Sequence, residues 1–393
     1  MMPLVGIRVI DMTHAGAGPF CTMLLADMGA EVIKIEPPTG EQFRNLLDGA
    51  VLMSTARNKR DIALDLRTPE GREIVLKLVS KADVFVENFV PDTMDRLGLG
   101  YEEMSRLNPK IIYCSISGFG QSGPLRQRGG YDVVAQAMSG LMMSLGEPDR
   151  PPVRIPAPLI DYGSGMYGAY AITLCLLDRE KTGKGERIDI SLLDTALSTM
   201  NYFVAHYSLT GNDPERAGSA MPTQNNPYQV FETSDSFIFV GVSTDRFWRR
   251  FCEALDLNDL GNDARYATRD GRKQNSQELL AILEKVLKHY TSEELESKLT
   301  EVGIPCARLL KLSEAIDHPQ VVSRQLIQDI EHPGSGKVKL VRTPIFFSGQ
   351  SPPIRLRAPL LGEHTSQILA ELGFSTDEIS QLIEKGVAVQ NSP

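Results

Sequence analysis

The residues with the clearest chemical potential lie in the segment Asp161-Tyr162-Gly163-Ser164-Gly165. It stands where an apolar stretch, residues 155–160, meets a run of small and apolar residues that predicts a tightly packed, buried helix over 163–177. A lone carboxylate at such a junction has two interpretations. It caps a helix N-terminus, or it is a partly desolvated nucleophile among glycines that let a bulky substrate approach closely.

Two glycine-bearing loops follow predicted strands. The first, Gly16-Ala17-Gly18-Pro19, precedes an apolar helix expected over Pro19–Met28, and the N–H groups at a helix N-terminus favour phosphate. Because Cys21 stands where the dinucleotide pattern GxGxxG needs its third glycine, an NAD site and a ligand-free turn both stay open. The second, Ser117–Pro124, is either a ligand-binding loop at the carboxyl edge of a sheet or an ordinary connection.

Four basic residues surround a third candidate region, at the end of the strand expected over Val84–Val86. A solvated surface is the ordinary explanation of such a set, and a pocket for a polyphosphate, with Arg as the planar donor, is the alternative. Its members, close to Asn88, are Lys59, Arg60, Arg67 and Arg96. The six histidines form no pair at helical spacing, so we expect no metal site.

Composition excludes several classes of protein. The 393 residues carry 41 Lys and Arg against 50 Asp and Glu, a net charge of −9 that gives no overall attraction to nucleic acid. Five scattered cysteines without a CxxC pair indicate reduced thiols. The start of the chain lacks the features of a secretion signal, and no apolar run approaches the ~20 residues that span a bilayer. We therefore expect a soluble, cytoplasmic protein with neither membrane nor nucleic-acid partners.

The elements that must position these residues alternate in type. Strands are expected at Val5–Ile10, Glu31–Ile35, Val84–Val86 and Ile111–Ile116, with helices between them. This alternation predicts an α/β fold with a doubly wound parallel sheet. Further along, residues 228–242 predict a β-hairpin that is followed by amphipathic helices.

Taken together, segments throughout the chain resemble the class III coenzyme A transferases, the family of formyl-CoA transferase and carnitine CoA-transferase. They occur in order, at family-like spacing, over essentially the whole sequence. The segments are Val9–Thr13, Ala17–Thr22, Leu25–Glu36, Asn58–Arg60, Ala82–Phe89, Gly118–Pro124, Lys181–Glu186 and Pro227–Phe231.

The resemblance implies a large Rossmann-like domain with a smaller α/β domain inserted, in a homodimer of interlocked subunits. The large CoA-binding domain would comprise 1–205 and a return segment, 311–393. A linker or active-site loop, 206–226, and the small domain, 227–310, would lie between them. The implied substrates are a coenzyme A thioester and a small carboxylate, with no further cofactor and no metal.

The resemblance also assigns roles to residues. Asp161 matches the nucleophilic aspartate, which would form an anhydride and then an aspartyl-CoA thioester. The residues that match CoA contacts are Gly16, Ala17, Leu64, Arg67, Asn88, Phe89, Arg96, Gly129 and Tyr131. The sequence departs from the family pattern at two places. Pro37 replaces an Arg found in some members. Gly218–Asn226 holds one glycine where formyl-CoA transferase has a glycine-rich lid, and this difference disfavours oxalate as the acceptor.

Three other functions compete with CoA transfer. Racemases of 2-methylacyl-CoA esters share the implied fold, but they supply a His in a Gly-His-Asp motif. The matching triplet here is Gly130-Tyr131-Asp132, and tyrosine, with a pKa near ~10, is a poor base at neutral pH. A non-catalytic acyl-CoA-binding protein and an NAD-dependent dehydrogenase are the remaining alternatives.

Overall fold

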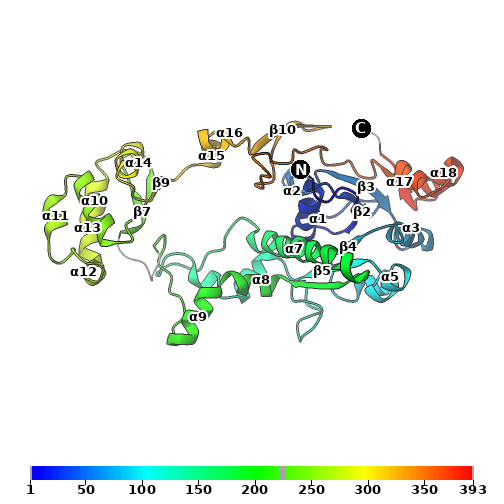
Figure 1. The fold of residues 1–393 in the computed structure, drawn as a ribbon, viewed down its shortest axis with the longest axis horizontal. Helices are drawn as coiled ribbons and strands as arrows, with labels where there is room; N and C mark the ends of the chain where they lie inside the picture. Colours follow the sequence, from blue (N-terminus) through cyan, green and yellow to red (C-terminus); the bar gives the residue numbers. More distant parts are fainter. Residues whose placement is uncertain (1, 221–226, 392–393) are drawn as a thin grey trace. The chain divides into compact units, whose positions relative to one another are not determined.

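The computed structural model describes residues 2–220 and 227–391, which form two compact units (Figure 1). Unit 1 comprises Met1–Leu141, Ile155–Val204 and Gln320–Pro393. Unit 2 comprises Met142–Arg154 and Ala205–Pro319. The chain therefore leaves the first unit twice and returns to it twice.

A seven-stranded sheet forms the centre of unit 1, in the order β12-β3-β2-β1-β4-β5-β6. All neighbouring strands are parallel except the pair β12 and β3, which is antiparallel. This is the doubly wound α/β arrangement that the sequence predicts. The strands are β1 (Arg8–Met12), β2 (Glu31–Glu36), β3 (Lys59–Leu64), β4 (Val84–Glu87), β5 (Ile112–Ser117), β6 (Arg187–Ser191) and β12 (Ala388–Val389).

Both faces of the sheet are buried, so neighbouring residues of a strand enter different cores. Val9 and Val32 pack on one face, while the adjacent Ile10 and Ile33 pack on the other. This alternation follows from the two-residue period of a strand. The helices of the first face are α1 (Ala17–Asp27), α6 (Asp132–Met138), α7 (Leu159–Thr182) and α8 (Leu192–Thr199).

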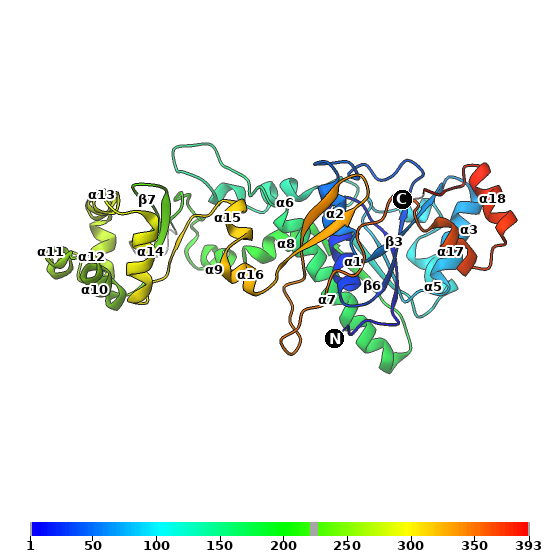
Figure 2. The same ribbon diagram turned by 90° about the horizontal axis from the view of Figure 1, so that it is seen from above.

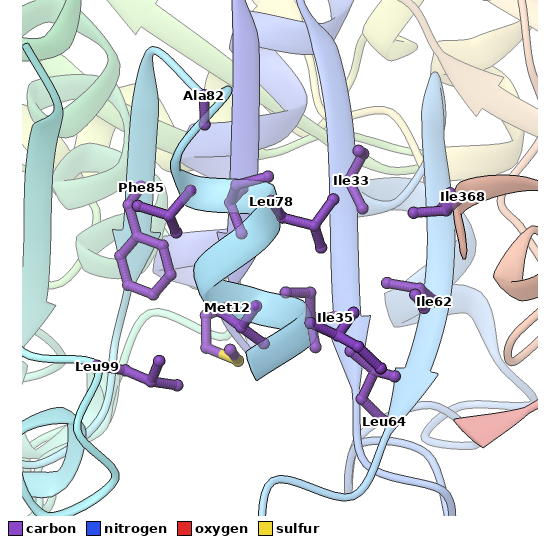
Figure 3. Packing of buried hydrophobic residues seen from close by; sticks show 14 of the residues in the cluster. Met12, Ile33, Ile35, Ile62, Leu64, Leu78, Ala82, Phe85, Leu99 and Ile368 are labelled. Atoms are coloured by element: carbon purple, nitrogen blue, oxygen red, sulfur yellow. The ribbon is translucent and has the colours of Figure 1, made fainter. Parts of the chain in front are cut away.

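The second face is covered by helices from both ends of unit 1 (Figure 2). Figure 3 shows Leu78 of one of them between Phe85 and Ile33 of the strands, with Met12 and, from the return segment, Ile368 in the same cluster. The return segment therefore contributes to the core of unit 1. These helices are α3 (Pro69–Val79), α5 (Tyr101–Leu107), α17 (Thr365–Glu371) and α18 (Thr376–Glu384).

Two predictions of local structure need correction. The first strand begins at Arg8 rather than Val5. Gly6 takes a positive φ of 92° and places the preceding residues in a turn, and pairing with β2 starts only at Arg8, opposite Glu31. The helix expected to be buried over 163–177 is α7, and only one of its faces is buried. Its other face exposes large apolar side chains, which are Met166, Tyr167, Tyr170, Leu174 and Leu177.

Unit 2 has its own core, in which Trp248 is fully buried. The expected hairpin is β7 (Tyr228–Glu232) with β8 (Phe237–Gly241), to which β9 (Cys306–Arg308) adds. Thr291 and Glu294 form a capping box at the start of its last long helix. The helices of this core are α10 (Asp245–Ala254), α11 (Asn258–Asn262), α12 (Arg269–Gln274), α13 (Ser276–Leu287) and α14 (Ser292–Glu301).

The segment expected as a linker over 206–226 starts as helix. Helix α9 (Asn201–Thr210) continues until Gly211, whose φ is 72°, because no Gly or Pro interrupts it earlier. Residues 221–226 lie outside the described residues. The remaining elements are α2 (Ala50–Thr55), α4 (Thr93–Arg96), the 3₁₀ turn Met142–Ser144, α15 (Leu312–Ile316), α16 (Pro319–Ser323), β10 (Ile327–His332) and β11 (Gly336–Val341).

Across residues 2–220 and 227–391, no helix combines the length and the apolar character needed to cross a membrane.

Candidate active site

The candidate site lies at the carboxyl ends of β1 and β4, the neighbouring strands at which the strand order reverses. Ligands of open α/β sheets bind at such a switch point. The loop after β1 is joined to the loop after β4 by a pair of hydrogen bonds: the His14 N–H donates to Asn88 Oδ1 at 2.9 Å, and Asn88 Nδ2 donates to the His14 carbonyl at 2.7 Å. Asn88 therefore fixes the backbone of the first loop.

Asp161 reaches this loop from the first turn of α7. Its carboxylate lies directly against Gly16, because a Cβ built on Gly16 would overlap Asp161 Oδ2. Helices α7 and α1 approach closely enough that a Cβ on Gly165 would stand 2.7 Å from the Ala17 carbonyl oxygen. Glycine at positions 16 and 165 is therefore required by space, and both positions bring the carboxylate to the loop.

Asp132 holds the start of α7 in place. Its Oδ2 accepts hydrogen bonds from the Ile160 N–H at 2.8 Å and the Asp161 N–H at 3.1 Å, which satisfies two amides that have no acceptor within the helix. Gln136 donates to the other oxygen of Asp132 at 2.5 Å. Asp161 itself is therefore not the cap of this helix, which removes the simplest structural explanation for its presence.

Burial raises the pKa of Asp161 to about 7, and the nearby carboxylate of Asp132 adds to the effect. The group is consequently poised between its protonated and ionised forms near neutral pH. A carboxylate that has lost most of its hydration is also a stronger nucleophile than one in water.

A cavity of about 590 Å³ opens next to the loop, along the carboxyl ends of β1 to β4. Its wall is apolar at Met12, Leu64 and Phe89, with charged groups at the rim, as in pockets for small organic ligands. The His14 ring packs on Phe89 with 4.9 Å between the centroids. A ligand in this cavity therefore lies beside the loop that touches Asp161.

The structure brings together some of the residues predicted to bind CoA. Leu64, Arg67 and Phe89 line the cavity. Arg67 is paired with Asp65 at 2.7 Å and its side chain is 87% exposed, so its guanidinium remains accessible from the cavity rim. Gly16 and Ala17 lie where the loop meets α1.

In the described part of the chain, six of the nine predicted residues lie outside the cavity wall: Gly16, Ala17 and Asn88, which belong to the two loops beside it, and Arg96, Gly129 and Tyr131. Arg96 is exposed on α4 and donates to Thr93, which does line the cavity, at 3.0 Å. Tyr131 is 57% exposed, with its ring 6.4 Å from that of Phe43. Gly129 has open space where a side chain would be.

The expected basic pocket is not formed by Lys59 and Arg60. Lys59 is fully buried and its Nζ donates to Asp11 at 2.8 Å, because its strand has no solvent-facing side. Arg60 pairs with Glu31 and Glu371 at 2.8 Å each. Both cations are therefore engaged in ion pairs within the fold, and neither lines the cavity as the described residues form it.

Sequence reasoning missed four residues around the site: Thr13, Lys34, Glu41 and Asp132. A signal existed for Lys34, because a charged residue within the apolar run of a parallel strand must be buried and paired. Glu41 lies in a loop with no comparable pattern. Among the described residues, no group of three or more His, Cys, Asp or Glu is placed to hold a metal ion.

A doubly wound sheet with a cavity at its switch point and a partly buried carboxyl at the adjoining loop defines an enzyme of the Rossmann-like class, and comparison with known proteins gives the family. The model of CoA-transferase family III matches residues 4–365, and the chain belongs to this family. It is accordingly an acyl-CoA:carboxylate CoA-transferase.

Individual relatives agree over nearly full length. The chain is 37% identical to the human succinyl-CoA:glutarate CoA-transferase, over 99% of this chain and 90% of that protein. It is 37% identical to the acetyl-CoA:oxalate CoA-transferase of Acetobacter aceti, over 94% and 95%. The crystal structure of a CAIB/BAIF family protein from Brucella suis superposes with a TM-score of 0.86 at 36% identity, covering 94% of this chain and 99% of that one.

The raised pKa of Asp161 predicts a pH-dependent gain in stability on substitution. Its ordinary pKa of 3.8 in the unfolded chain rises to about 7 in the folded protein, so ionisation opposes folding increasingly as the pH rises through that window. We expect Asp161→Asn to be more stable than the wild type at pH 8 by roughly 1–4 kcal/mol. Thermal unfolding from pH 5 to 8.5 should show the difference widening up to about pH 7 and then levelling. A less stable variant at pH 8 would contradict this interpretation.

Proposed function

We propose that Asp161 is the covalent nucleophile of the transfer. Its Oδ attacks the carbonyl carbon of the acyl-CoA, the carbon–sulfur bond breaks, and a mixed anhydride forms with release of CoA as its thiolate. The thiolate then attacks Asp161 Cγ, which gives an aspartyl-CoA thioester and frees the donor carboxylate. The observation that carries the proposal is the partly buried Asp161 carboxylate against Gly16, at the loop that borders the cavity and away from any capping role.

The acceptor carboxylate reverses the sequence. It attacks Asp161 Cγ to form a second anhydride and displaces the thiolate, which then attacks the acceptor's carbonyl carbon and regenerates the Asp161 carboxylate. No proton is consumed overall. Keeping CoA bound makes each attack intramolecular, for which effective molarities reach ~10⁵ M or more.

Each tetrahedral intermediate carries a negative charge on oxygen that needs stabilisation. Helix α1 starts directly after Gly16, and the first N–H groups of a helix have no acceptors within it. Amides in this position are worth roughly 3 kcal/mol each when aimed at a developing oxyanion. We infer that the α1 N-terminus supplies them.

The pH dependence and covalent trapping of Asp161 test this mechanism. Incubation with succinyl-CoA and hydroxylamine should convert Asp161 to a hydroxamate that mass spectrometry of the peptide detects. Because only the ionised carboxyl attacks, the rate should rise with pH up to about 7 and then level. Asp161→Asn should fold and lose transfer by a factor of at least ~10³. Asp132→Asn keeps an oxygen acceptor for the helix amides. As the control, it should still form the hydroxamate at Asp161. Full transfer by Asp161→Asn would refute the mechanism.

For the substrates we propose succinyl-CoA as donor and a dicarboxylate of four or five carbons as acceptor. Support comes from the human relative, which is named for succinyl-CoA and glutarate. The single glycine in Gly218–Asn226 argues against an oxalate lid of the formyl-CoA transferase kind, although a relative of equal identity is named for oxalate.

A panel of acyl-CoA donors against carboxylate acceptors checks the substrate assignment. With succinyl-CoA as donor, product acyl-CoAs identified by mass should show glutarate and other C4–C5 dicarboxylates favoured over oxalate by at least about tenfold in kcat/KM. The control is 2-methylacyl-CoA in heavy water without acceptor, which should gain no α-deuterium. Enzyme-dependent deuterium uptake would instead indicate a racemase, and preference for oxalate would refute the proposed acceptor.

We further propose a homodimer of interlocked subunits in which the exposed face of α7 is covered. Met166, Tyr167, Tyr170, Leu174 and Leu177 recur at helical spacing and are each 45–63% exposed. Monomeric proteins rarely leave a contiguous apolar stripe of this kind in water. The stripe lies on the helix that carries Asp161, so covering it would also stabilise the site.

Subunit exchange distinguishes an interlocked dimer from an ordinary one. We expect a particle of twice the 43.3 kDa chain mass in analytical ultracentrifugation. Tagged and untagged dimers mixed under native conditions should form no hybrid within hours, because threaded subunits separate only on unfolding. Tyr170→Asp should lower the yield of dimer, whereas Asp178→Lys, on the exposed end of the same helix, should not. A monomer, or rapid exchange, would contradict the proposal.

A further inference from the structure

In the loop between β1 and α1, side chains supply the hydrogen bonds that hold the backbone. Its backbone is held by side chains at consecutive residues: the Thr13 N–H donates to Asp11 at 3.1 Å, the Thr13 carbonyl accepts from Lys34 Nζ at 2.7 Å, and Asn88 binds both polar groups of His14. The Ala15 N–H donates to Glu41 Oε2 at 2.9 Å. The loop conformation is therefore set by side chains from other segments.

Ala15 is the strained point of this loop. Its φ is 64°, in the left-handed region that costs a residue with a Cβ roughly 1–2 kcal/mol. The next residue is Gly16, which touches the Asp161 carboxylate. If Ala15 relaxed to a negative φ, the direction of the chain at Gly16 would change, and Gly16 would leave Asp161.

Glu41 is the side chain that opposes this relaxation. It comes from the loop after β2, where its own N–H donates to the buried Glu36 at 2.9 Å. Its side chain is 5% exposed, and Oε1 lies 3.9 Å from the Lys34 ammonium, which is 1% exposed. The carboxylate is thus held on both sides and aimed at the Ala15 amide.

Glu41 also lines the 590 Å³ cavity. A molecule that fills the cavity therefore packs against the same side chain that fixes Ala15. Neither Lys34 nor Asn88 combines these two positions, because neither lines the cavity in the described residues.

We propose that Glu41 is a positioning residue for Asp161: through the Ala15 N–H it keeps the loop in its strained form, with Gly16 against the nucleophile, and so connects occupancy of the cavity to the reactivity of Asp161. This inference rests on the proposed role of Asp161 as the nucleophile. It implies that the part of the CoA thioester remote from sulfur contributes to kcat as well as to binding, since binding energy far from the reacting atoms can be used to orient them.

The first test separates the hydrogen bond from other effects of Glu41. Glu41→Ala should lower kcat by about 10–100-fold, the usual cost of misplacing a reacting group by about 1 Å, with KM changing much less. Glu41→Gln keeps an oxygen that accepts from Ala15 and should retain most of kcat. If Glu41→Ala does not fold, Glu41→Met, which preserves the side-chain volume, is measured in its place. Equal losses in the Gln and Ala variants, or none in Ala and Met, would overturn the proposal.

Asn45→Ala is the matched control. Asn45 is exposed in the same loop as Glu41, but among the described residues it belongs neither to the cavity wall nor to the hydrogen bond with Ala15. Its substitution should leave both kcat and KM within about threefold. A fall in kcat equal to that of Glu41→Ala would show that any change to this loop has the same effect, and would refute a specific role for Glu41.

The strain at Ala15 gives a rescue experiment. Glycine adopts positive φ without a steric cost, so Ala15→Gly in the Glu41→Ala background should restore at least about half of the lost activation free energy, read as kcat. The ratio of kcat for succinyl-CoA to that for succinyl-pantetheine should be large in the wild type and fall several-fold in Glu41→Ala. No rescue together with an unchanged ratio would overturn the inference.

Assaying Asp161→Asn in parallel separates a failure of the proposed function from a failure of the role proposed for Glu41. If the wild type shows no transfer that depends on Asp161, the proposed function fails. If that transfer is present and the Glu41 variants retain full kcat, only the role of Glu41 fails.

Discussion

A loop that leaves the buried edge of a parallel sheet must satisfy its backbone polar groups without strand or helix partners. In this protein that constraint falls on Thr13, His14 and Ala15, and buried side chains meet it. The position of Gly16 follows from those bonds, and the environment of Asp161 follows from Gly16. The geometry of the candidate active site is thus an indirect product of side chains that come from other segments of the chain.

Buried charges beneath the loop are tolerated because each has several partners. Lys59 Nζ donates to Asp11, to the Pro19 carbonyl and to Thr22 within 2.9 Å. Although burial raises the pKa of Asp11, the Lys59 and Lys34 ammonium groups hold it below its ordinary value. An ion pair in the interior is weak support for stability, but removing one partner is costly. The network therefore fixes a particular arrangement of β1, α1 and β3.

The sequence predicts those features that depend on local patterns. Short apolar, β-rich runs identify β1, β2, β4 and β5, and residues with capping side chains, such as Thr291 and Ser375, stand at helix starts in the structure. Asp161 stands out because a carboxylate interrupts an otherwise uncharged segment. Contacts between distant segments leave no such pattern: nothing near Glu41 indicates that it binds Ala15, and nothing near Asp132 indicates that it caps α7.

Composition alone likewise does not predict which face of a helix is buried. Small and apolar residues over 163–177 predict a tightly packed, buried helix, yet large apolar side chains recur on an exposed face of α7. The basic residues also looked equivalent in sequence. Lys59 lies on a strand with two buried faces and Arg67 lies beyond its end, so only Arg67 reaches the cavity.

The outer edge of β3 is completed by residues far along the chain. Ala388 and Val389 pair with Leu64 and Ala63, and His364 exchanges hydrogen bonds with the backbone of Asp61. While the polypeptide is being synthesised, this edge has no partner until all of unit 2 has been made. Exposed strand edges template intermolecular pairing, and contacts this distant in sequence form slowly. The nascent chain consequently exposes an unpaired strand edge until the return segment has been made, and loss of that segment should cause aggregation during biosynthesis before it affects catalysis.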